Sequence, residues 1–156
     1  MKTSILPALL VLAALTAPPA VGQPQAASIA EWRRGVGCVA LMEKLTFENE
    51  RGVASLAAAM RKDPKMAEQL LRMQKEQGEA IAQKRGMIAT MARNTDAMLA
   101  ANYEAWAHDA SLPAAAELAR RERAEATRVA AQPNTAPALM KLIDDGHCED
   151  FLLGNR

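Results

Sequence analysis

The chain has 156 residues, of which half are hydrophobic and only 3% aromatic, and its 19 basic and 18 acidic side chains leave a net charge of +1. This balance gives no long-range attraction to phosphate backbones or anionic lipid surfaces, which argues against nucleic-acid binding as a function. Helix-favouring residues such as Ala, Leu, Met, Glu and Arg are abundant and strand-favouring residues are sparse, so we expect an all-α fold.

The first 22 residues have the three-part pattern of a secretory signal peptide. Lys2 is the only charged residue before Glu31, and an uncharged, largely apolar run spans residues 5–17. That run is shorter than the roughly 20 residues that a membrane-spanning helix needs. Two prolines follow it, and residues 20–22 then supply the small-x-small sequence that a signal peptidase reads. We therefore predict cleavage before Gln23 and export to the periplasm or the extracellular space.

The residues that remain after cleavage are enough for one domain. No uncharged apolar run among residues 23–156 approaches the length of a membrane span. Removal of Lys2 with the signal leaves equal numbers of basic and acidic side chains. We expect a short polar tail over residues 23–27 and a single helical domain over residues 28–153.

A capping box marks the start of the first expected helix. The hydroxyl of Ser28 can accept a hydrogen bond from the backbone N–H three residues on, and the carboxylate of Glu31 can reach back to the N-cap. Apolar residues then recur at helical spacing to about residue 45. A second, short helix is expected from about residue 48 to residue 61. Whether the first helix bends or stops near Thr46 is left open by the pattern.

Residues 64–108 are expected to form one long helix. Asp63 is a good N-cap and Pro64 suits the first helical position, and the next proline is Pro113. A helix of this length would extend about 68 Å, and Gly78 or Gly86 are the places where it would kink. One stripe of apolar residues follows it: Met66, Leu70, Met73, Met87, Met91 and Met98. We expect this stripe to contact the core or an apolar partner protein, because unbranched thioethers adapt to varied apolar surfaces.

Two further helices complete the expected bundle of four or five. One begins near Pro113 and ends before Pro133, and opposite charges three and four residues apart support it in water. The last opens at Thr135, has a proline within its first turn, and ends near Gly146.

Cys38 and Cys148 are the two cysteines of the chain. In an exported protein, which meets an oxidising environment, such a pair is most simply a disulfide. The bond would join the first expected helix to the last and close a long loop, which favours the folded state by about 4.7 kcal/mol in the chain-entropy model. The alternative is a pair of free thiols.

The candidate ligands for a metal ion are few. His147 and Cys148 lie among acidic residues near the C-terminus, and this set has the donor types that zinc or copper binds. No second group of ligands with the usual metal-binding spacing occurs elsewhere in the chain. Oxidation of Cys148 would also remove the strongest donor of the set. Met87 and Met91 lie one helical turn apart and offer thioether ligands to cuprous ion. Core packing is the competing explanation for both methionines, and we prefer it.

Catalytic and cofactor motifs are not evident in the sequence. There is no Cys-x-x-Cys-His sequence for haem attachment and no Gly-x-Ser-x-Gly sequence for a hydrolase. His108 and His147 are the only histidines available to a nucleophilic enzyme. We therefore expect neither a cofactor nor an enzymatic activity.

A five-residue segment resembles in part the signature of a known chaperone family. Leu45-Thr-Phe-Glu-Asn49 is similar to the Leu-Thr-x-x-Gln motif of stress-induced periplasmic chaperones of the Spy type, with asparagine at the last position and one copy in the chain. The segment is too short to assign the family. The leading hypothesis is an exported interaction or chaperone-like protein that contacts another protein through an apolar helix face. The alternative is an envelope metal-handling protein that binds copper or zinc through Met87, Met91 or His147.

Overall fold

The computed structural model describes residues 27–61, 64–133 and 135–153, and within them the fold is all-α, as predicted. The expected signal peptide, nearly all of the polar tail, and the expected N-cap Asp63 lie outside the described residues. The helices in chain order are α1 (Ile29–Met60), the short 3-10 helix η1 (Pro64–Met66), α2 (Ala67–Asp109), α3 (Ala115–Ala130), α4 (Ala136–Asp145) and α5 (Cys148–Leu153).

Helix α1 is continuous from its capping box to Met60. The predicted box is present: the Glu31 backbone N–H donates to Ser28 Oγ at 3.1 Å, and the Ser28 N–H donates to Glu31 Oε2 at 2.7 Å. The prediction of a separate helix over residues 48–61 is wrong, because no break occurs at Thr46. The Thr46 side chain is buried, and its hydroxyl donates to the carbonyl of Met42 at 2.9 Å. The hydroxyl group is therefore satisfied within the helix, and α1 continues through this residue.

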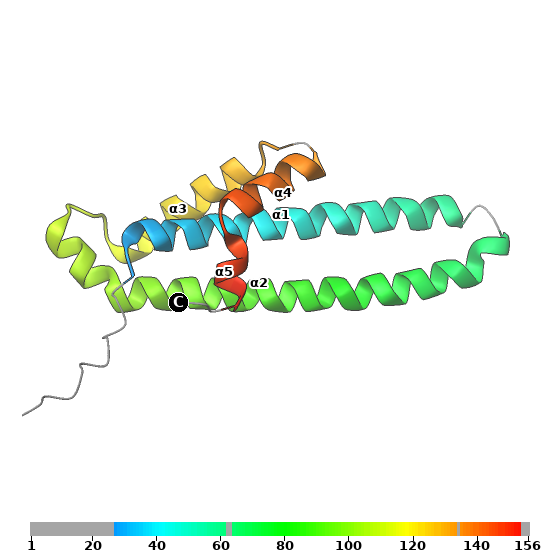
Figure 1. Ribbon diagram of the computed structural model, residues 1–156, viewed down its shortest axis with the longest axis horizontal. Coiled ribbons are helices and arrows are strands. Elements are labelled where there is room, and N and C mark those ends of the chain that lie inside the picture. The colour runs from blue at the N-terminus through cyan, green and yellow to red at the C-terminus, as the bar shows by residue number, and fades with distance from the viewer. Residues whose placement is uncertain (1–26, 62–63, 134, 154–156) are drawn as a thin grey trace, which may run out of the picture.

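Helix α2 has 43 residues and runs without interruption through Gly78 and Gly86. At 1.5 Å per residue it is about 65 Å long. It lies antiparallel to α1, and the two form a long hairpin (Figure 1). Helix α1 therefore lies alongside the apolar stripe of α2, and α4 and α5 add contacts at Met91.

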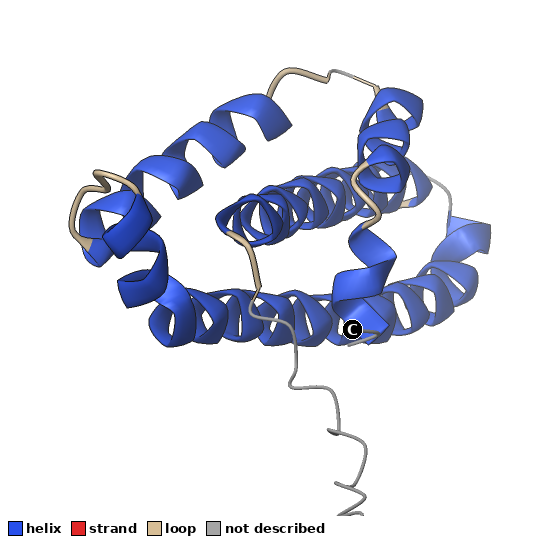
Figure 2. Cartoon of the chain, turned by 60° about the vertical axis from the view of Figure 1, so that its left-hand side comes forward, coloured by secondary structure: helices blue, strands red, loops and turns tan. Residues whose placement is uncertain are grey.

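The remaining helices wind around one half of α1. Figure 2 shows α1 obliquely, with the other helices arranged about it. One buried cluster joins α1, α2 and α3 and contains Trp32, Val36, Leu99, Leu118 and Ala119. A second joins α1, α2, α4 and α5 and contains Cys38, Met91, Leu139, Ile143 and Cys148. These two clusters form the base of the molecule.

The predicted disulfide between Cys38 and Cys148 is present, with an S–S distance of 2.03 Å. Both cysteines are buried, and they attach α5 to α1. Gly35, one turn before Cys38, permits this close approach. A Cβ at that position would lie 3.0 Å from Cε1 of Phe151 on α5 and 3.2 Å from Oγ1 of Thr95 on α2.

Beyond the base, the hairpin continues as a two-helix arm, which we define as residues 52–60 and 66–84. In Figure 1, α3, α4 and α5 lie along the other half of the hairpin and leave the arm uncovered. The arm carries two exposed leucines, Leu56 at 50% and Leu71 at 67%. No helix in the described part of the chain is long and apolar enough to cross a membrane.

Candidate binding groove

A groove runs between α1, α2 and α3 on one side of the hairpin. It consists of two hollows of about 380 and 320 Å³ that share Glu43 and Ala92. Hollows of this size fall in the range of ligand-binding clefts. The hollow nearer the base of the molecule is lined by Val36, Val39, Ala40, Glu43, Ala92, Thr95, Asp96, Arg123 and Thr127. The other is lined by Glu43, Thr46, Phe47, Glu50, Arg85, Ile88, Ala89 and Ala92. We call the two together the groove.

Helical periodicity explains why these residues line one surface. The α1 residues of the groove recur every three or four positions from Val36 to Glu50, and the α2 residues recur in the same way from Arg85 to Asp96. Such spacing places each set on one face of its helix. The groove therefore depends on α1 continuing through Thr46, because a break there would separate its two halves.

Ion pairs neutralise most of the charge in the groove. At one end Arg85 Nη2 of α2 lies 2.6 Å from Glu50 Oε1 of α1. At the other end Arg123 of α3 pairs with Asp96 of α2. Glu43 lies between these pairs, and within the described residues its carboxylate has neither a hydrogen bond nor an ion pair. One negative charge in the groove is thus left without a cation.

The threonine hydroxyl groups in the groove already donate their protons. Thr46 donates to Met42, Thr95 to the Met91 carbonyl at 2.8 Å, and Thr127 to the Arg123 carbonyl at 2.9 Å. Each bond runs to a carbonyl four residues back in the same helix. The threonines therefore offer an incoming ligand only methyl groups and acceptor lone pairs.

Phe47 is the large apolar residue at the edge of the groove. Phe47 is 53% exposed, whereas Trp32, Val36 and Ala40, which precede it on α1, are buried. Lys44 Nζ and Arg51 Cζ lie 5.9 and 5.8 Å from its ring centroid, within the range of cation–π contact. These two cations lie over the ring and fix it on the surface of α1.

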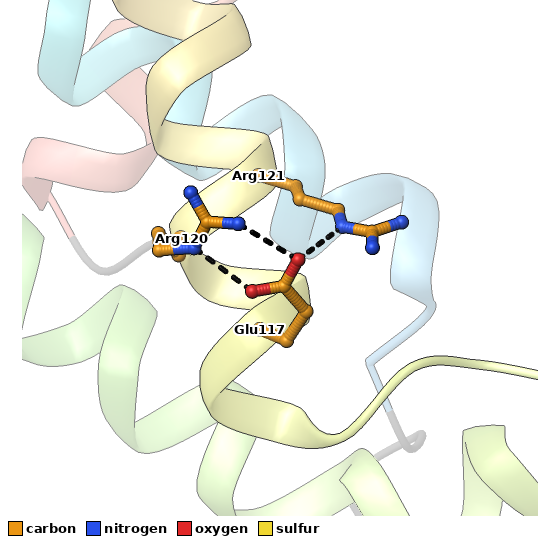
Figure 3. A network of polar contacts seen from close by, with 3 residues as sticks. All are labelled: Glu117, Arg120 and Arg121. Carbon is orange, nitrogen blue, oxygen red and sulfur yellow. Dashed lines mark hydrogen bonds and ion pairs between the residues drawn. The ribbon is translucent and has the colours of Figure 1, made fainter.

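A separate polar network lies on α3, away from the hollows (Figure 3). The carboxylate of Glu117 accepts from Nε and Nη2 of Arg120, each at 2.8 Å, and also from Arg121. Hydrogen bonding to the two guanidinium groups lowers the pKa of Glu117 to about 2. This network satisfies side chains of a solvent-facing turn of α3, and its three residues line neither hollow of the groove.

The stripe predicted from the sequence divides among three environments. Leu70 and Met91 are buried, while Met66, Met73 and Met98 are half-buried. Met87 is 40% exposed and lines a separate hollow of about 320 Å³ beside Phe151 of α5. None of the six lines the groove, and the use of this stripe for partner contact stays a prediction.

The candidate metal ligands do not form one cluster. Cys148 is committed to the disulfide, and His147 is exposed, with a left-handed backbone conformation at φ 50°. Met91 packs in the core beside the disulfide, whereas Met87 faces the surface. Within the described residues, no three His, Cys, Asp or Glu side chains gather where they could hold a metal ion.

Known proteins provide no assignment for this chain. No family model matches it, and no curated protein or solved structure is significantly similar to it.

Proposed function

We propose that this protein is a non-enzymatic, chaperone-like binding protein of the cell envelope that holds apolar segments of other polypeptides in the groove. The observation that carries the proposal is the exposure of Phe47 at the edge of an open hollow between α1 and α2. A large aromatic side chain beside a concave surface is a typical anchor for a bound segment.

The construction of the molecule supports a binding role. The groove lies on the face of a rigid hairpin whose base is fixed by two buried clusters and a disulfide. A preformed surface loses little entropy when a ligand is ordered on it, so more of the contact energy contributes to affinity. The two ion pairs at its ends join α1 to α2 and α2 to α3.

The envelope location rests on the N-terminal sequence, with Lys2, the apolar run and the small residues at positions 20–22. Mass spectrometry of protein purified from the envelope or the medium tests it. We expect a mature chain that begins at Gln23. A product that retains Met1 would contradict export through this signal.

A matched pair of variants tests the binding role. Phe47→Ser removes the apolar side chain at the groove, and Met140→Ser removes one of similar exposure, 43%, on α4 outside the groove. The assay is light scattering from a urea-denatured client protein without cysteines, diluted into buffer with or without the oxidised protein. We expect the wild type and Met140→Ser to suppress aggregation and Phe47→Ser to lose most of this effect. Equal suppression by both variants, or none by the wild type, would contradict the proposal.

A further inference from the structure

We infer that the groove receives an amphipathic helix of a partner protein, and that one basic side chain midway along its apolar face binds Glu43. This inference rests on the proposed function and names the class of segment that the groove selects. It depends on the position of Glu43, on the unbalanced charge of the groove, and on the shape of its lining.

Glu43 lies at the middle of the groove. On α1 it is seven residues from Val36 and seven from Glu50, the two limits of the lining, which is two helical turns in each direction. The whole lined segment is about 21 Å long, or four turns. A bound helix of the same length would place a residue opposite Glu43 at its own midpoint, with apolar residues one and two turns away on either side.

The charge of the groove calls for a cation at this point. Its other two carboxylates, Glu50 and Asp96, are each paired with an arginine, so the lining has a net charge of −1 that resides on Glu43. A wholly apolar segment would strip water from this carboxylate without replacing its hydrogen bonds, which is costly. A lysine or arginine would supply both the charge and the donors, so Glu43 makes the groove selective among apolar segments.

The lining favours a helix over an extended segment. The sides of the groove are rows of side chains at helical spacing, and the described residues contain no strand edge to which an extended chain could add. The threonine hydroxyls are already committed as donors. A helix satisfies its own backbone hydrogen-bonding groups. The groove therefore needs to supply only apolar contacts and the carboxylate of Glu43.

Two synthetic peptides test this inference. Each is a fluorescein-labelled helix of about 15 residues, with leucines one and two turns before and after the centre on the same face. The central residue is lysine in one and glutamine in the other. Binding to the oxidised wild type is measured by fluorescence anisotropy at low and at physiological salt. We expect the lysine peptide to bind about tenfold more tightly, with a preference that shrinks as salt rises.

Two variants assign the preference to Glu43. Glu43→Gln removes the charge in the groove, while Glu104→Gln removes an exposed carboxylate on α2 outside it. We expect Glu43→Gln to bind both peptides alike and Glu104→Gln to keep the wild-type preference. An unchanged preference in Glu43→Gln would overturn the inference.

The remaining outcomes separate this inference from the proposed function. Equal binding of both peptides to the wild type would overturn the role of Glu43 and leave the proposed function standing. Binding of neither peptide would contradict both. Sedimentation that shows a dimer of the wild type but a monomer of Glu43→Gln would overturn the inference in favour of a second copy of this chain as the occupant.

Discussion

Reduction of the Cys38–Cys148 disulfide is expected to cost this protein much of its stability. The bond joins residues 110 positions apart, so it removes a large part of the freedom of the unfolded chain. In the chain-entropy model a loop of this length contributes about 5 kcal/mol. Domains of this size are stable by only about 5–15 kcal/mol in total. With a urea m-value of about 2 kcal/mol/M, the midpoint of unfolding should fall by about 2.5 M on reduction.

The assay is urea unfolding followed by far-ultraviolet circular dichroism, with and without a phosphine reductant. The control is the double variant Cys38→Ala with Cys148→Ala, whose midpoint should be low and should not respond to the reductant. Because the bond attaches α5 to α1, hydrogen exchange should accelerate first in α5 and in the α4 residues that pack beside it. Midpoints of oxidised and reduced protein that agree within about 0.2 M would refute this reasoning.

Three further predictions concern the helix packing, a strained residue and the acid response. Gly35→Ala should destabilise the protein by about 1–2 kcal/mol, because the new methyl group meets the ring of Phe151 and the hydroxyl of Thr95. Gly37→Ala has open space around it and should stabilise the protein by up to about 1 kcal/mol. Chemical unfolding of the two variants tests this, and a gain in stability in both would contradict the packing at Gly35. His147→Gly should raise the stability by about 1 kcal/mol, since glycine adopts a left-handed conformation without strain, and a lower thermal midpoint would count against this. The pKa of Glu117 is lowered in the folded state from 4.5 to about 2, so its stabilising effect is complete above pH 4.5 and is lost as the pH falls toward 2. Thermal midpoints should therefore fall less steeply over that range in Glu117→Gln than in the wild type, and parallel profiles would show that the arginine contacts do not matter.

Local sequence patterns were sufficient to predict much of the fold. The capping box of Ser28 and Glu31 marked the start of α1, and the absence of proline between Pro64 and Pro113 indicated the long helix. The cysteine pair followed from its count and the expected compartment. Each of these signals lies within a few residues or depends on a single residue type, which is why each could be read without knowing the packing.

The continuity of α1 was not determined by local pattern. Thr46 and Phe47 have moderate helix propensity, and the neighbouring sequence does not indicate that α2 packs against this part of α1. The glycines of α2 presented the same difficulty, because the helix passes Gly78 and Gly86 while it lies against α1.

The groove was missed for the same reason. Its lining combines two helix faces with Arg123 and Thr127 of α3, and their meeting depends on how the chain winds around α1. One signal was present: the residues from Val36 to Glu50 keep a single helical spacing across Thr46. That spacing would place these residues on one face of a continuous helix, but it does not by itself determine that the helix continues through Thr46.

The central claim is that the groove is where this protein binds its partners, and a nuclear magnetic resonance titration tests it most directly. Isotope-labelled oxidised protein is titrated with the lysine-centred peptide, and backbone amide shifts are followed for every assigned residue. The account predicts shifts concentrated over residues 36–50 of α1, 85–96 of α2 and 123–127 of α3, with Glu43 and Phe47 among the largest. Shifts confined to the arm around Leu56 and Leu71, or no shifts at all, would contradict it.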